Sequence, residues 1–124
     1  MLTLFKNITE ELTDLEKETL VPMLVDTLST TNEDNRTRGK HLAGWLSACG
    51  YTTTEVRIRK MVNYIRVMNL CKPKVLIGAQ NGYYLTEDIQ VVDDQIESLQ
   101  GRINSMLAAI DSIKAQRINL KYSK

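Results

Sequence analysis

Hydrophobic positions along the chain follow helical spacing in four segments and form short apolar runs in one, which predicts a mainly α-helical protein with a small β-hairpin. The first helix is expected to begin near Thr13, because Thr13 and Glu16 have the spacing of a capping box. Pro22 lies inside the apolar pattern and should bend this helix or mark a break. The apolar face of the helix consists of Leu20, Met23, Leu24 and Leu28.

Two shorter helices follow, with only a few residues between them. The first is predicted over residues 37–48, with Gly50 as its stop signal. The second is predicted over residues 52–68, with Thr52 and Glu55 as its capping box. The residues expected to face the core are Leu42, Trp45 and Leu46 in the first helix, and Ile58, Met61, Val62 and Ile65 in the second. The short connection is typical of a helix-turn-helix.

A β-hairpin is predicted after Pro73. Residues 75–77 form an apolar run that predicts one strand, and residues 82–85 predict the return strand. Asn81 and Gly82 both tolerate positive φ and favour a tight turn between the strands. Two helices joined by a short turn and followed by a hairpin have the order of a winged helix-turn-helix.

The last helix is expected to run from near Asp88 to about Asn119, a length of roughly 45 Å at 1.5 Å per residue. Its apolar residues recur at alternating intervals of four and three, which is a heptad repeat. These residues are Val92, Ile96, Leu99, Ile103, Met106, Ile110 and Ile113. Such a helix is too long to bury its whole apolar stripe within a small domain, so we expect a homodimer through it. Packing of the stripe against the first helix, on Leu20, Leu24 and Leu28, is the alternative.

These elements divide the chain into an N-terminal helix and loop (residues 1–35), a winged helix-turn-helix domain (residues 36–86) and a C-terminal oligomerisation helix (residues 87–124). No apolar run approaches the roughly 18–20 residues that span a bilayer, and the N-terminus lacks the pattern of a signal peptide. Cys49 and Cys71 lack the spacing of metal ligands and are expected to be reduced thiols. These features indicate a cytoplasmic protein.

The net charge of +1 conceals an uneven distribution. Residues 1–35 carry two lysines and eight acidic residues, whereas residues 36–74 carry nine basic residues and Glu55 as their one acid. Residues 75–124 carry five basic and six acidic residues. A basic block of this kind can attract a polyphosphate chain, and a merely solvated face is the alternative.

The predicted helix over residues 52–68 presents an arc opposite its apolar stripe that carries residue types known to contact DNA. Thr53, Arg57 and Lys60 lie nearest its N-terminus and are expected to reach base edges. Basic residues at the start of the preceding helix and polar residues of the hairpin are expected to meet phosphates. The full set of expected DNA contacts is Arg36, Arg38, Lys40, Thr53, Arg57, Arg59, Lys60, Asn63, Tyr64, Lys72, Lys74, Gln80 and Asn81.

The same residues carry a resemblance to a known family. Ile58, Val62, Ile65 and Arg66, followed by the wing residues 82–85 (Gly-Tyr-Tyr-Leu), resemble the N-terminal domain of the biotin operon repressor. The layout is also similar to small winged-helix proteins encoded by bacteriophages and mobile elements. The resemblance covers residues 36–86 and implies a DNA-binding winged helix-turn-helix, associated with the nucleoid of a bacterial or phage-infected cell. The ligase domain of the biotin repressor has no counterpart here, so that activity is not implied.

The sequence therefore predicts a non-enzymatic double-stranded DNA-binding protein, either a dimeric transcriptional regulator or an accessory factor in phage or plasmid replication. No catalytic residue, cofactor or metal site is expected, because His41 is the one histidine and no glycine-rich phosphate loop is present. Two alternatives remain open. The basic helix and hairpin could bind a protein instead of DNA, or they could bind structured RNA.

Overall fold

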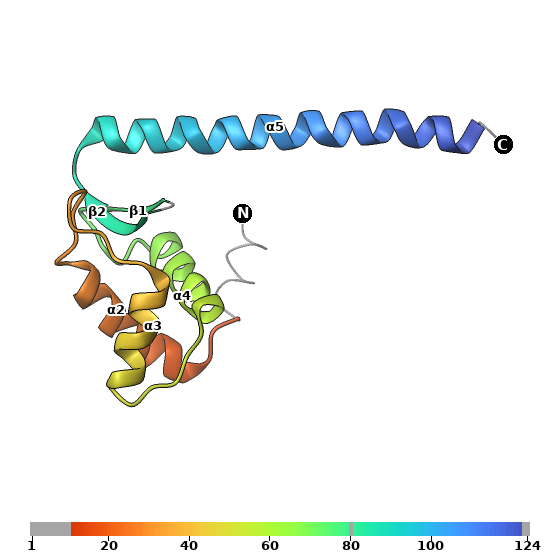
Figure 1. Cartoon of the computed structure of the whole chain (residues 1–124). Helices are drawn as coiled ribbons and strands as arrows, with labels where there is room; N and C mark the ends of the chain where they lie inside the picture. Colours follow the sequence, from red (N-terminus) through yellow and green to blue (C-terminus); the bar gives the residue numbers. More distant parts are fainter. Residues whose placement is uncertain (1–10, 80, 123–124) are drawn as a thin grey trace. The chain divides into compact units, whose positions relative to one another are not determined.

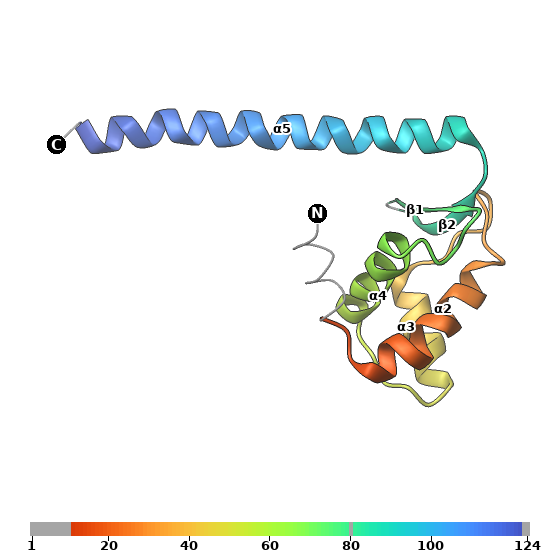
Figure 2. The same cartoon turned by 180° about the vertical axis from the view of Figure 1, so that it is seen from behind.

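The computed structural model describes residues 11–79 and 81–122 (Figures 1 and 2). The fold is mainly helical, with a small antiparallel hairpin and a long C-terminal helix, which confirms the coarse expectation from the sequence. The elements are η1 (Glu16–Leu20), α2 (Val21–Leu28), α3 (Gly39–Ala48), α4 (Glu55–Val67), β1 (Val75–Ala79), β2 (Gly82–Thr86) and α5 (Ile89–Tyr122). No helix within the described ranges is both long enough and apolar enough to cross a membrane.

The first helix begins as the capping box predicts. The backbone N–H of Glu16 donates to the Thr13 hydroxyl at 3.2 Å, and the N–H of Thr13 donates to the Glu16 carboxylate at 2.9 Å. The first turns are a π-helix in which the Val21 N–H reaches the carbonyl of Glu16. Pro22 follows in the first turn of α2. Because a proline ring crowds the carbonyl four residues before it, a wider turn at this point relieves the clash. Pro22 thus marks a change of helix type.

Helix α3 ends where Gly50 predicts. Gly50 has a φ of 95°, and the Tyr51 N–H donates to the Leu46 carbonyl at 2.9 Å. Leu42 and Leu46 are buried, as expected. The prediction that Trp45 lies in the core is wrong, since 37% of this residue is exposed. Trp45 lies about 80° around the helix from the midpoint between Leu42 and Leu46, at the edge of the buried stripe.

Helix α4 begins later than expected, and its cap is a different threonine. Thr54 has an extended backbone, and its hydroxyl accepts the Arg57 N–H at 3.3 Å. The predicted capping box between Thr52 and Glu55 is therefore wrong. The helix ends at Val67, and Asn69, two residues later, adopts a φ of 56°. Its predicted buried stripe is confirmed and comprises Ile58, Met61, Val62 and Ile65. Helix α4 packs against both α3 and α2.

The hairpin pairs β1 and β2 in antiparallel register, with Val75 opposite Thr86 and Ala79 opposite Gly82. The turn falls where the sequence predicts, although Gln80 lies outside the described residues. The hairpin is also attached to the segment before α3, because Thr37 and Tyr83 exchange backbone hydrogen bonds of 3.0 and 2.6 Å. This bridge ties β2 to the segment that enters α3.

The buried side chains of the hairpin complete the core of the N-terminal unit. Leu76 and Leu85 join the apolar residues of η1, α2, α3 and α4 in one cluster. Thr31, which is also buried, donates its hydroxyl to the Leu28 carbonyl at 2.6 Å and accepts the Leu85 N–H at 3.1 Å. The end of α2 is therefore joined to β2 with every buried polar group of Thr31 satisfied.

The chain divides into two compact units between Glu87 and Asp88, so the first helix belongs to the same unit as residues 36–86. Helix α5 forms the second unit and has no buried residue. The carboxylate of Asp88 accepts the Gln90 N–H at 2.9 Å and caps its first turn. The residues named in the alternative packing of α5, Leu20, Leu24 and Leu28, are already part of the core of the N-terminal unit.

Candidate nucleic-acid interface

One side of α4 is exposed and polar along its whole length. Arg59, Asn63 and Arg66 are all exposed and follow one another at intervals of four and three, so they lie on one edge of the helix. Val56 and Val67 are exposed beside them, at 50% and 40%. This face points away from the stripe that packs on the core. It can therefore enter a groove of a partner without any change in the packing of α4.

The expectation that Arg57 is free to contact a base differs from what the structure shows. Its Nε donates to Glu16 Oε2 at 2.8 Å, and its Nη2 donates to the Glu11 carbonyl at 3.0 Å and to the other carboxylate oxygen of Glu16. The Glu16 side chain is only 8% exposed. Arg57 thus connects α4 to the capping box of the first helix, and its charge is neutralised there.

Hydrogen bonding to Arg57 lowers the pKa of the Glu16 carboxyl, although burial opposes this shift; the capping-box bonds to Thr13 lower the pKa as well. A carboxylate whose pKa is lower in the folded state stabilises the fold at pH values above its unfolded pKa of about 4.3. That stabilisation is lost as the pH falls through the folded-state pKa.

We expect Glu16→Gln to lower the free energy of unfolding at pH 7 by about 1–3 kcal/mol, because Arg57 loses its charged partner. The same variant should flatten the dependence of stability on pH below about 5. Glu18→Gln, which changes an exposed acid two residues away, is the matched control. Urea unfolding at pH 7 and pH 4 measures both effects. Equal losses for the two variants would contradict the role assigned to Glu16.

Lys60 is paired much more weakly. Its Nζ lies 3.8 Å from a carboxylate oxygen of Glu11, and both side chains are well exposed, at 39% and 52%. Such a pair contributes little and exchanges readily with another anion. Lys60 therefore remains available to the exposed face of α4.

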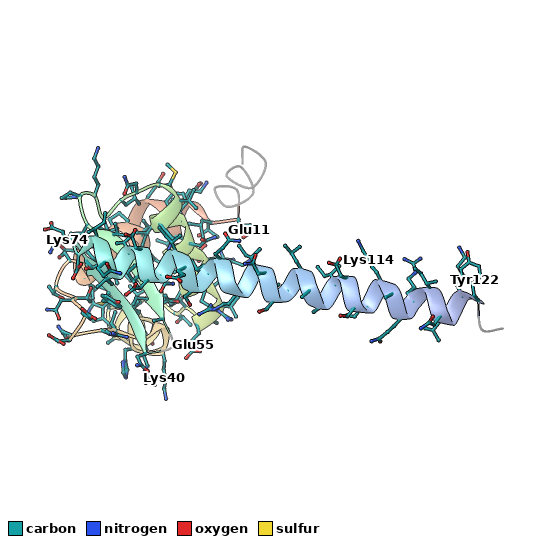
Figure 3. All side chains as sticks on the ribbon, turned by 90° about the horizontal axis from the view of Figure 1, so that it is seen from above. Glu11, Lys40, Glu55, Lys74, Lys114 and Tyr122 are labelled. Atoms are coloured by element: carbon teal, nitrogen blue, oxygen red, sulfur yellow. The ribbon has the colours of Figure 1, made fainter. Side chains whose placement is uncertain are left out.

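The three basic residues expected at the start of α3 differ in their surroundings. Arg36 precedes the helix, donates from Nε to the Glu33 carbonyl at 2.8 Å and stacks 4.5 Å from the centre of the Tyr84 ring. Arg38 is the N-cap residue and is exposed, and Lys40 is exposed in the first turn. Figure 3 shows Lys40 pointing outward from the N-terminal unit. Arg38 and Lys40 are free to meet an anion, whereas Arg36 serves the packing of β2.

The segment between α4 and β1 adds two basic residues. Lys72 is exposed, and Lys74 is half-buried with its side chain directed outward (Figure 3). Arg66 is exposed near the end of α4 and was not among the expected DNA contacts. One of its guanidinium nitrogens lies 3.0 Å from the position that a Cβ at Gly78 would occupy. Two features of the sequence could have indicated Arg66: its spacing of seven residues from Arg59, and the glycine at position 78 in the strand beside it.

The remaining expected contacts are divided between the exposed face and other surfaces. Asn63 and Asn81 are exposed, and Thr53 is half-buried before α4. Tyr64 lies away from the exposed face, because it lines a groove of about 530 Å³ beside α2. Gln80 lies outside the described residues.

Six residues of the central basic block have no ion pair with an acid within residues 11–79 and 81–122 and, unlike Arg36, are not held by a backbone carbonyl or an aromatic ring. We call them the free basic set: Arg38, Lys40, Arg59, Arg66, Lys72 and Lys74. They come from the start of α3, from the exposed edge of α4 and from the segment that enters β1. Glu55 is the one acidic residue in this block. The segment that carries the set therefore has a large excess of positive charge.

Among the residues that the structure describes, no three His, Cys, Asp or Glu side chains are grouped to hold a metal ion. Burial raises the pKa of the Cys71 thiol. Comparison of the chain with protein-family models, curated proteins and solved structures finds no match.

Proposed function

We propose that residues 36–86 form a winged helix-turn-helix that binds double-stranded DNA, with α4 as the recognition helix and the β1–β2 hairpin as the wing. The observation that carries this proposal is the free basic set. Its members lie at the start of α3, on the exposed edge of α4 and in the segment that enters β1. In a winged helix-turn-helix the helix before the turn, the recognition helix and the wing meet DNA, which supports the proposal. The packing of α4 on α3 and α2, with its polar edge outward, supports the same reading.

The residues divide into two roles. Arg59, Lys60 and Asn63 project from the first two-thirds of α4, where Arg and Lys suit guanine edges and Asn suits adenine. Val56 supplies an apolar surface for a thymine methyl group. The cations at the start of α3 and in the segment that enters β1 meet phosphates and set the orientation of the helix; they are Arg38, Lys40, Lys72 and Lys74. Arg57 positions α4 through Glu16 and does not read a base.

The protein acts as a homodimer through α5, without catalysis and without a cofactor. Its exposed apolar residues recur along the helix, and helices of this kind gain their stability mainly by packing. A dimer presents two recognition helices to a two-fold DNA site. The function is that of a cytoplasmic, nucleoid-associated regulator of transcription or an accessory factor in the replication of a phage or plasmid.

One observation favours a second candidate, in which the N-terminal unit docks a protein. The groove beside α2 is open and lined mainly by apolar residues, with Lys17 and Asp26 among its polar ones. Its other lining residues are Val21, Pro22, Val25, Ser29, Tyr64 and Leu70. A protein partner in this groove would leave the free basic set without a role, which is why DNA binding is preferred.

The test is selection of bound sequences from random duplex DNA, followed by affinity measurements on the selected site at several salt concentrations. We expect Arg59→Ala to weaken specific binding by about 1–3 kcal/mol and to relax the preference at one or two base pairs. Lys40→Ala should weaken binding to all duplexes alike and reduce the slope of log affinity against log salt by about one unit, since one phosphate contact is lost.

Lys17→Ala is the matched control, because this lysine lies in η1 and lines the groove instead of the basic surface. It should leave DNA affinity and salt slope unchanged. If no duplex is enriched and affinity is insensitive to salt, the DNA-binding proposal is overturned. If Lys17→Ala weakens DNA binding as much as Lys40→Ala does, the surface has been assigned wrongly.

A further inference from the structure

The heptad repeat of α5 extends beyond Val92 and Ile113 at both ends. Ile89 adds a core position before Val92, and Leu120 adds one in the last turn. The a positions are Ile89, Ile96, Ile103, Ile110 and Arg117, and the d positions are Val92, Leu99, Met106, Ile113 and Leu120. Eight of these ten residues are exposed large hydrophobic side chains, from 45% for Leu99 to 75% for Ile89. Nine of the ten a and d positions are apolar, which is the pattern of a coiled coil.

Charge is distributed unevenly along this helix. Its first third carries Asp93, Asp94 and Glu97 and no basic residue. From residue 102 onward it carries four basic residues and Asp111 as the one acid; the basic residues are Arg102, Lys114, Arg117 and Lys121. Figure 3 shows Lys114 projecting from the basic part of the helix. Two copies in parallel would bring like charges together, whereas two copies in antiparallel orientation would place each acidic third beside the partner's basic part.

The antiparallel register that buries all ten core positions sets Ile103 of one copy opposite Met106 of the other. In that register Asp93 flanks Lys114 of the second copy, and the pair occurs twice by symmetry. Arg117 then lies opposite Val92 of the second copy, next to its acidic first turns. In a parallel pair Arg117 would face Arg117 inside the core, which is a costly place for two like charges. Antiparallel macrodipoles also attract, whereas parallel ones repel.

We propose that α5 pairs in antiparallel orientation with α5 of a second copy, in the register that places Asp93 beside Lys114. This inference rests on the dimer of the proposed function and fixes its geometry. The helix starts of the two copies are then about 46 Å apart along the coiled coil, at 1.5 Å per residue. The two DNA-binding units are therefore attached further apart than one turn of DNA, which is about 34–36 Å. The dimer is suited to half-sites separated by more than one turn or to two separate DNA segments.

Charge reversal tests the orientation in the full-length chain. In the antiparallel dimer, Asp93→Lys and Lys114→Asp should each raise the dimer dissociation constant on the order of tenfold, because two attractive pairs become repulsive. The double variant should restore the original value. In a parallel dimer Asp93 would face Asp88 and Lys114 would face Ala109. Asp93→Lys would then tighten the dimer, and Lys114→Asp would leave it unchanged. Sedimentation equilibrium without DNA measures all four proteins.

A distance measurement gives an independent readout. Spin labels on Ala115→Cys, in a chain with Cys49→Ser and Cys71→Ser, should be offset by about 31 Å along the antiparallel dimer and by nothing along a parallel one. A monomer, a parallel distance or no restoration by the double charge reversal would overturn this inference. DNA binding by a monomer would overturn this inference and the proposed dimer while sustaining the proposed DNA binding. An antiparallel dimer that binds no DNA would do the reverse.

Discussion

Replacing Leu99 and Ile103 together with lysine is expected to convert the protein into a folded monomer. Both residues lie in the middle of the apolar stripe of α5, and they are 45% and 50% exposed in the single chain. In a dimer they would be buried, and placing two charges per chain into that seam costs several kcal/mol. On a helix face that stays in solvent, the same change would cost almost nothing. The mass from sedimentation equilibrium therefore reports directly on whether the stripe is covered.

Two other properties should be measured on the monomeric variant. Helix α5 should lose part of its helical circular dichroism in the monomer, because an isolated helix is marginal without packing. The N-terminal unit should keep its melting transition, since its core contains no residue of α5. Affinity for a DNA with two sites should fall to that of a single unit, because the effective concentration supplied by the second unit is lost.

Ser105→Lys with Ala108→Lys is the matched control, because these residues lie on the same stretch of α5 outside the a and d positions. This variant should remain dimeric. A Leu99→Lys, Ile103→Lys protein with unchanged mass but a lower melting temperature would mean that the stripe packs within its own chain. A protein unchanged in both properties would show that the stripe is not buried at all.

The elements that could be predicted from the sequence are those whose period is imposed by burial. Ile58, Met61, Val62 and Ile65 recur as a helix requires when one face packs on a core, and all four are buried. The long helix α5 was predicted from the same kind of spacing, although none of its residues is buried in the single chain. The prediction was wrong for Trp45, which is exposed. A residue at the margin of an apolar stripe is covered or exposed depending on what packs beside it.

The cap of α4 shows a different limit. Thr52, Thr53 and Thr54 are consecutive and share the same side chain, so the pattern does not distinguish which one turns its hydroxyl toward the helix. The extended backbone of Thr54 decides it. That conformation depends on how the turn after α3 returns the chain to the core, which is a property of the packed unit and not of the tripeptide.

The positive charge of the candidate site could be predicted from the sequence. Which of its basic side chains are free to contact a ligand could not. The basic block is visible in the sequence, yet Arg57 is neutralised by Glu16, which lies 41 residues earlier in the chain. Local periodicity contains no information about a contact at that separation. Arg66 was missed for the opposite reason, because its place beside Gly78 arises only when the hairpin packs near the end of α4.

A second large effect is expected at Gly82, the first residue of β2. Its φ is 120°, a conformation that side-chain-bearing residues rarely adopt. A Cβ there would lie 2.6 Å from the Thr37 carbonyl oxygen and 2.9 Å from the carbonyl carbon, where backbone atoms have no room to give. Gly82→Ala must therefore break the bridge between Thr37 and Tyr83 or strain the hairpin. Strain of this kind costs about 1–3 kcal/mol before the clash is added, so we expect a loss of about 3 kcal/mol or more.

For a unit of this size such a loss lowers the melting temperature by roughly 12–20 °C. Gly44→Ala is the matched control, because Gly44 lies in α3 with no atom within 4 Å of its potential Cβ. Removing an exposed helical glycine should raise stability by about 0.5–1 kcal/mol.

Gly78→Ala is a third case: its Cβ would meet only the end of the Arg66 side chain at 3.0 Å and the Tyr83 ring at 3.4 Å. It should cost little stability but displace Arg66 and weaken DNA binding. If Gly82→Ala melts like the parent protein, the bridge does not hold the hairpin, and the wing would have to be positioned by its buried side chains alone.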